Sequence, residues 1–395
     1  MTTAHRSIDE GFSSVTAPDE PWVDTKRRWW LLGLIVPTLP VLAWAAGTFS
    51  GISLGWWLGP FLVVVVIPGV DALLGEDRSN PPESAVEQLS ADRFYRWCTY
   101  LYLPLQYAGL AFACWVVATG DLGWFEWLGY ALSVGTVAGI AINTAHELGH
   151  KATKSERRLA RIALAQSGYG HFYIEHNRGH HKRVATPEDP ASSRLGESFW
   201  EFLPRTVIGS LRSAWELECN GLAHRSQRVL SRHNGVLMGW LGTAGLFAVL
   251  TAAFGWSVLG FLVVQAVVGF SLLEIVNYIE HYGLLRQVDE RGRYERCRPE
   301  HSWNSNHIGS NLVLYQLERH SDHHAHPTRR FQALRHFEEA PQFPNGYGGM
   351  IALAAIPPLW RRVMDHRVVE LYDGDVTRAN LHPRNRDATV ARYRS

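Results

Sequence analysis

Histidine spacing is the feature of this 395-residue chain that points most directly to chemistry. The segment HELGH places His146 and His150 four residues apart, so both imidazoles lie on one face of a helix and can bind one ion. Two further segments have the patterns H-x-x-x-H-H and H-x-x-H-H. Adjacent histidines on a helix point about 100° apart, so each doublet favours two neighbouring metal ions over one. With His281, which follows a long apolar run, the candidate metal ligands are His146, His150, His176, His180, His181, His281, His320, His323 and His324.

These imidazoles are numerous enough for two ions with four or five ligands each. Ligand type leaves the metal open, because imidazole suits iron, copper, nickel and zinc. The motif at His146 also matches zinc metalloproteases, in which Glu147 would be the general base. A single zinc ion would leave most of the histidines unused, and a site at the ends of apolar helices favours oxygen chemistry on lipid-soluble substrates. We therefore favour iron. Four further histidines are candidates for outer-sphere donors, ordinary polar positions or a substitute ligand: His171, His307, His326 and His336.

Composition excludes several other classes of protein. The four cysteines form no C-x-x-C pair, which argues against a thiolate zinc site, an iron-sulfur cluster or a built-in rubredoxin domain. A net charge of +1 argues against a nucleic-acid-binding surface. An aromatic content of 12% is too high for a disordered chain.

The histidine segments are placed by apolar runs long enough to cross a bilayer, each near the required length of about 20 residues. The predicted fold is all-α: a polytopic membrane protein with six transmembrane helices and a cytoplasmic helical cap that carries the metal site. A shorter apolar run from Met350 to Leu359 is expected to pack inside this cap or at the interface. The six predicted spans are approximately 29–47, 52–74, 97–118, 124–145, 235–254 and 257–279.

Basic residues predict the orientation of these spans. The short connections near 47–52, 119–123 and 255–256 contain no Lys or Arg, whereas the connections on the other side contain many. Both termini and the histidines are therefore expected on the cytoplasmic face of a bacterial inner membrane. The predicted regions are a tail at 1–28, spans one to four at 29–145, a cytoplasmic region with the first two histidine segments at 146–234, spans five and six at 235–282, and a cytoplasmic C-terminal region with the third segment at 283–395.

The histidine segments resemble the histidine boxes of the membrane di-iron family that includes fatty acid desaturases, xylene monooxygenase and alkane 1-monooxygenase. Segments that look like alkane 1-monooxygenase signatures are Asp71 to Pro82, Asn277 to Gly283, Asn304 to His307 and Leu317 to Pro327. The resemblance implies two iron ions held by the nine histidines, O2 as co-substrate, and terminal hydroxylation of medium-chain n-alkanes to primary alcohols.

The resemblance also implies partners and supporting residues. Electrons would come from NADH through a reductase and a separate rubredoxin, which could dock on Arg329, Arg330, Arg335, Arg361 and Arg362. Carboxylates and an amide expected to orient the imidazoles are Glu147, Glu175, Asp189, Asn277, Glu280 and Asp322. The alternatives are a membrane fatty acid desaturase, a xylene-type hydroxylase, an intramembrane zinc protease using His146, Glu147 and His150, and a metal-carrying protein without catalysis.

Overall fold

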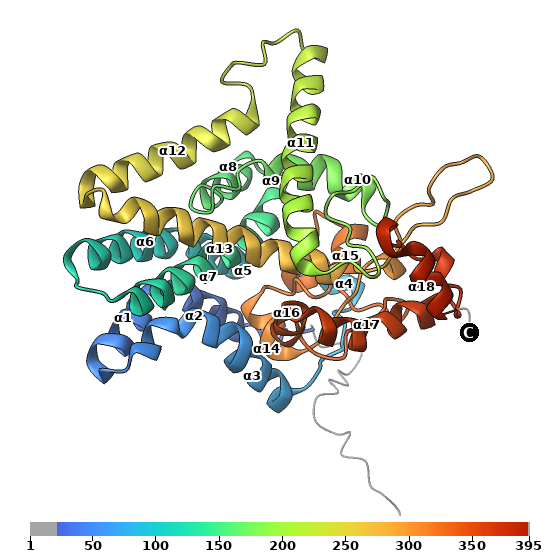
Figure 1. Cartoon of the computed structure of the whole chain (residues 1–395), viewed down its shortest axis with the longest axis horizontal. Coiled ribbons are helices and arrows are strands. Elements are labelled where there is room, and N and C mark those ends of the chain that lie inside the picture. The colour runs from blue at the N-terminus through green and yellow to red at the C-terminus, as the bar shows by residue number, and fades with distance from the viewer. Residues whose placement is uncertain (1–21, 394–395) are drawn as a thin grey trace, which may run out of the picture.

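The computed structural model describes residues 22–393, so most of the predicted tail at 1–28 lies outside the described residues. All regular elements of the described range are helices, and six helical segments are long and apolar enough to cross a membrane. These six run roughly side by side in Figure 1. The all-α membrane fold predicted from the sequence is thereby confirmed.

The six segments match the predicted apolar runs closely, except that the third begins earlier and the fourth ends later. They are Trp29–Ser50 with α1 (Leu39–Ser50), Ser53–Leu74 with α2 (Leu58–Phe61) and α3 (Ile67–Leu74), Arg93–Thr119 with α5 (Arg93–Tyr100) and α6 (Tyr102–Thr119), α7 (Trp124–Gly149), α12 (Gly235–Phe254) and α13 (Ser257–Glu280).

Close contact between α7 and α13 holds the centre of the bundle together. Gly135 and Gly139, spaced as in a small-xxx-small motif, form the contact face of α7. A Cβ atom at Gly135 would lie 2.5 Å from Val268 Cβ, and one at Gly139 would lie 2.8 Å from a Leu272 methyl carbon. The two helix backbones can therefore approach only because these positions lack side chains.

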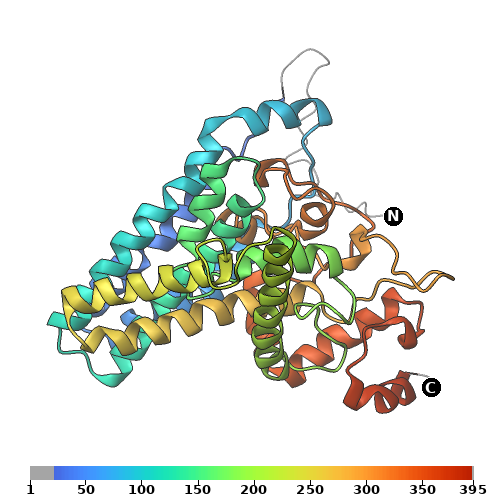
Figure 2. The same ribbon diagram turned by 90° about the horizontal axis from the view of Figure 1, so that it is seen from above.

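The remaining helices cap one end of the spans. Ser198 starts the longest of them with a capping box to Glu201, and this helix, α11, runs across the direction of the spans in Figures 1 and 2. Met350 to Leu359 forms parts of two short helices, with Met350 buried and Leu359 exposed. The cap helices are α4 (Glu83–Ala91), α9 (Phe172–Glu175), α10 (His181–Arg183), α11 (Phe199–His224), α14 (Ile308–Val313), α15 (His320–Ala325), α16 (Tyr347–Ala354), α17 (Pro357–Leu371) and α18 (Arg386–Tyr393), whereas α8 (Lys154–Ala163) runs back along α7.

One stretch of the predicted cytoplasmic region folds back among the spans. Gln166, which follows α8, contacts Gln265 of α13. Gln265 is nearer the Ser257 end of α13 than its Glu280 end. Gln265 Nε2 donates to the Gln166 carbonyl at 2.9 Å, and Gln166 Nε2 donates to Gln265 Oε1 at 3.0 Å. Gln106 of α6 similarly donates to the Ala163 carbonyl at 3.1 Å. These amides supply partners to irregular backbone in an apolar setting, which hydropathy alone does not reveal.

Candidate metal centre

Four distant stretches of the chain bring all nine predicted histidines together at one end of the spans. α7, the turn between α9 and α10, the C-terminus of α13 and α15 meet there, as Figure 1 shows. The imidazole nitrogens form two groups, and within each group the potential ligand atoms all lie within 4.8 Å of one another. The five-histidine group comprises His146, His150, His176, His181 and His323, and the four-histidine group comprises His180, His281, His320 and His324.

The first histidine pair stands on the last turns of a membrane span. α7 continues to Gly149, so His146 and His150 project from the end of the helix that contacts α13. Their ring centroids are 5.2 Å apart, as expected for positions i and i+4 on one helix face. The rigid span thus fixes two members of the five-histidine group.

The second histidine segment forms a π-helical turn at His176–His180. In an α-helix, residues five apart diverge by about 140°. The wider i to i+5 turn of a π-helix brings them together, and His176 Nε2 and His181 Nε2 lie 3.0 Å apart. The π-turn therefore explains how this segment supplies two imidazoles to one group while His180 faces the other.

Each histidine doublet divides between the groups, as the angle between adjacent helical residues requires. His181 belongs to the five-histidine group and His180 to the other, and His323 and His324 divide in the same way. Among the nine, only His150 and His181 are partly exposed. The five-histidine group is therefore the nearer of the two to solvent.

The spacing of the nitrogens fits metal coordination. His146 Nε2 lies 2.7 Å from His323 Nε2, which lies 3.1 Å from His181 Nε2. In the other group, His324 Nε2 lies 2.9 Å from His320 Nε2. Two nitrogens at right angles, each at a typical metal distance of about 2.1 Å, are about 3 Å apart. Buried Nε2 atoms of His150, His180 and His281 have no hydrogen-bond partner within residues 22–393, so their lone pairs are free for an ion.

Most of these imidazoles are in the neutral form that binds metals. Burial lowers the pKa of His281 to about 3. Burial also lowers the pKa of six other grouped histidines outside the spans well below the ordinary value, namely His150, His176, His181, His320, His323 and His324. His180 differs, because burial lowers its pKa but the Asp189 carboxylate outweighs that effect and raises it. Asp189 thereby holds a proton on the Nδ1 side of His180.

Two of the predicted orienting carboxylates do reach imidazoles. Asp189 Oδ2 is hydrogen-bonded to His180 Nδ1 at 2.9 Å, and Glu280 Oε1 lies 3.2 Å from His320 Nδ1 without hydrogen-bond geometry. The Asp189 bond sets the orientation of the His180 ring and leaves Nε2 for the ion. Burial would raise the pKa of Asp189, but the His180 contact lowers it to about 2. Asp189 is therefore an anion at neutral pH.

The other four predicted orienting residues contact different groups. Glu147 Oε1 pairs with Lys151 Nζ at 2.9 Å and accepts from the Phe331 amide at 3.3 Å. This engagement argues against a free general base, and so against the zinc protease alternative. The remaining three are Glu175, which binds Arg183 and Ser213; Asn277, which binds Glu274; and Asp322, which binds His326, Arg329 and the Arg335 amide.

Sequence reasoning missed Glu274, a buried carboxylate within α13. It accepts hydrogen bonds from Tyr169 and Thr206 at 2.8 Å each and from Asn277 at 3.2 Å. An ionisable residue inside an apolar span is a functional candidate by default, so the signal was present in the sequence.

The four histidines considered as outer-sphere donors or substitute ligands lie outside both groups. His307 contacts Ser305 at 2.8 Å, His326 contacts Asp322 at 2.8 Å, and His336 contacts Asn306 at 3.1 Å. His171 is buried, and neither ring nitrogen has a hydrogen-bond partner in the part of the chain that the structure describes.

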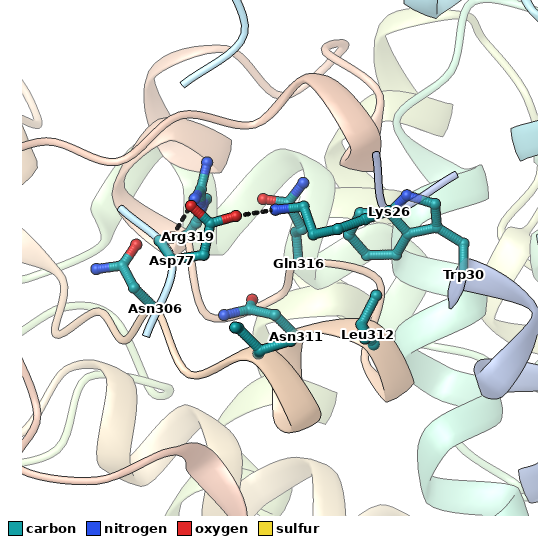
Figure 3. A pocket seen from close by; sticks show the side chains of 9 residues that line it. Lys26, Trp30, Asp77, Asn306, Asn311, Leu312, Gln316 and Arg319 are labelled. Atoms are coloured by element: carbon teal, nitrogen blue, oxygen red, sulfur yellow. Dashed lines mark hydrogen bonds and ion pairs between the residues drawn. The ribbon is translucent and has the colours of Figure 1, made fainter. Parts of the chain in front are cut away.

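Arg319, next to His320, anchors the third histidine segment to the loop after α3. Its guanidinium donates to the carbonyls of Asp77 at 2.8 Å, Ser79 at 3.1 Å and Leu334 at 2.8 Å. A small pocket lies beside it, where Lys26 forms an ion pair with the Asp77 side chain (Figure 3). The Arg319 hydrogen bonds thus connect the segment Asp71 to Pro82 with the segment Leu317 to Pro327.

Comparisons with known proteins agree with this arrangement. A family profile described as fatty acid desaturase matches residues 123–354. The chain is 45% identical to the alkane 1-monooxygenase of Acinetobacter baylyi over 98% of this chain and 96% of that relative. It is 46% identical to an alkane 1-monooxygenase of Pseudomonas putida over 97% and 95%. Identity to the xylene/toluene monooxygenase hydroxylase component of Pseudomonas putida is 27% over 78% and 82%.

Proposed function

Because the chain belongs to the alkane 1-monooxygenase family, within the wider fatty acid desaturase family, we propose that it hydroxylates the terminal carbon of medium-chain n-alkanes. The observation that carries this proposal is the pairing of a five-histidine and a four-histidine group at one end of the membrane spans. The balanced reaction consumes one alkane, one O2, two electrons and two protons, and yields a primary alcohol and water.

Two iron ions held by the nine histidines would supply the activation of O2. The chain's own residues contribute the positions of the ligands. α7 holds His146 and His150, Asp189 orients His180, and Glu280 lies against His320. A terminal C–H bond is stronger than its methylene neighbour, so selectivity has to come from positioning the chain end between the spans.

We place the metal centre on the cytoplasmic face of a bacterial inner membrane. The concentration of Lys and Arg in the connections at that end supports this orientation. A cytoplasmic site is also accessible to a soluble electron donor, for which a separate rubredoxin with an NADH-dependent reductase is the proposal.

The donor is expected to dock over His150 and His181, the two partly exposed ligands. Lys182 is exposed beside His181 and suits an acidic partner. Three arginines considered for docking are instead engaged in ion pairs: Arg329 with Asp322, Arg330 with Glu156 and Arg335 with Glu83.

Product analysis tests the reaction. The full chain is expressed with a rubredoxin and its reductase, alkanes of graded length are supplied, and products are identified by gas chromatography with mass spectrometry. We expect primary alcohols, with no product from the His323→Ala variant. An alkene product would support a desaturase, and a secondary alcohol would contradict terminal positioning.

Donor docking is tested separately with a charge reversal. Lys182→Glu should raise the KM for reduced rubredoxin severalfold, leave kcat nearly unchanged, and reduce the dependence of kcat/KM on ionic strength. Arg291→Glu reverses an exposed charge at the tip of the loop between α13 and α14 and serves as the matched control. Equal KM changes in both variants would contradict this docking surface.

A further inference from the structure

The two histidine groups differ in their electrostatic surroundings. Carboxylates contact the four-histidine group directly, through Asp189 at His180 and Glu280 at His320. Among the described residues, no carboxylate makes a hydrogen bond or ion pair with a member of the five-histidine group.

The carboxylates beside the four-histidine group are fixed in place. Asp189 also accepts from the Ser192 hydroxyl at 2.6 Å and the Ala191 amide at 3.1 Å. Glu280 accepts from the Tyr347 hydroxyl at 2.9 Å. These bonds hold the carboxylates as neighbours of the imidazoles, on the side away from Nε2.

The charges beside the five-histidine group oppose each other. Lys151 follows His150 in the chain, and its Nζ lies 2.9 Å from the Glu147 carboxylate. The hydrogen bond from Asp189 to an imidazole goes to His180, in the four-histidine group. The net effect is a more negative setting for the four-histidine group.

Resting on the proposed di-iron centre, we infer that Asp189 and Glu280 make the four-histidine position the one that favours ferric iron. Negative charge in a water-poor interior stabilises a 3+ ion more than a 2+ ion. Asp189, which is hydrogen-bonded to His180 Nδ1, also makes Nε2 of that ring a stronger ligand. Both effects act in the same direction, so the two positions differ in reduction potential.

Stepwise oxidation of the purified full chain tests this inference. The protein is loaded with ferrous iron of the Mössbauer-active isotope, the iron content is measured, and ferricenium is added in one-equivalent steps. Each step removes one electron from iron and reduces one ferricenium to ferrocene. We expect two ferrous doublets, of which the first equivalent converts one with a preference of at least about tenfold, since one buried charge contact exceeds that effect.

Variants identify the position that is oxidised first. Glu280→Gln should change the quadrupole splitting of that doublet and reduce the preference severalfold, and Asp189→Asn should act in the same direction. Glu147→Gln, which leaves Lys151 unpaired beside the five-histidine group, should increase the preference. Glu188→Gln removes an exposed carboxylate next to Asp189 and should change nothing.

Parallel conversion of both doublets in the unmodified chain would overturn the inference, as would an unchanged preference in Glu280→Gln. If Asp189→Asn loses iron, stepwise oxidation of the unmodified chain and of Glu280→Gln still decides whether the two positions differ. Iron content separates this result from failure of the proposed function. Fewer than two irons per chain would overturn both, whereas two irons with parallel conversion would overturn the inference alone.

Discussion

His146 Nε2 and His323 Nε2 lie 2.7 Å apart, although 177 positions separate the two residues in the chain. His323 Nε2 is also 3.1 Å from His181 Nε2, so one imidazole connects the first, second and third histidine segments. A single proton can satisfy only one of these nitrogen pairs, because each neutral imidazole carries one N–H. A shared cation satisfies all three nitrogens at once.

Replacing the central imidazole should therefore empty its group. We expect His323→Ala to lower iron affinity by more than the approximately 10- to 100-fold loss typical of an outer-sphere change, and to abolish hydroxylation. Iron per purified chain, measured by inductively coupled plasma mass spectrometry, checks this outcome. His366→Ala, at an exposed histidine, is the control. Full iron content in His323→Ala would contradict the ligand assignment.

The membrane fold and the nine histidines could be predicted because each depends on local pattern. Apolar run length decides whether a helix can span a bilayer, and histidine spacing decides which rings share a face. The division of His180 from His181 was foreseeable from helix geometry, but the π-turn that pairs His176 with His181 was not. Tertiary contacts determine such a turn.

The contacts between carboxylates and imidazoles were harder to predict than the grouped histidines themselves, because sequence position does not say which way a carboxylate faces. Glu147 lies between two ligands and yet pairs with Lys151, whereas Asp189 reaches His180 across nine positions. The contact between Gln166 and Gln265, deep among the spans, was missed for a related reason. Charged α8 precedes it, so hydropathy marks the whole stretch as cytoplasmic.

Arg319 should resist even a conservative change. Its planar guanidinium reaches the carbonyls of Asp77, Ser79 and Leu334 together, which the single nitrogen of lysine cannot do. Arg319→Lys should lose at least one of these hydrogen bonds from a charged donor, at a cost of about 1.5–3 kcal/mol.

Thermal unfolding in detergent, followed by tryptophan fluorescence, measures the Arg319→Lys effect, and iron content should fall with it because His320 is adjacent. Arg296→Lys, at an exposed position, should change stability by less than about 0.5 kcal/mol. An unchanged Tm in Arg319→Lys would show that the loop after α3 does not depend on this anchor.

The α7–α13 contact makes a separate prediction. Gly135→Val adds a side chain where a Cβ would already lie 2.5 Å from Val268, so the helices must separate. We expect a loss of about 1–3 kcal/mol in stability. Iron content should also fall, because α7 carries His146 and α13 ends at His281. Gly245→Val in α12, where no atom lies within 4 Å of the added Cβ, is the matched control. Equal losses in both variants would refute the close-contact explanation.

His171 predicts a pH dependence that belongs to the fold and not to the metal ligands. Burial lowers the pKa of this imidazole to about 4, compared with about 6.5 in an unfolded chain. The native state therefore binds fewer protons in this interval, and its stability falls as the pH decreases from about 6.5 towards 4.

His171→Phe removes the titrating group and both ring nitrogens, while keeping a ring beside Tyr169, whose centroid is 4.3 Å away. Between about pH 7.5 and pH 5, the variant should lose about 2 kcal/mol less stability than the unmodified chain, as measured by Tm in matched detergent. Equal losses would show that other groups cause the pH dependence, and a large loss in the variant at about pH 7.5 would show that His171 has a bonding partner.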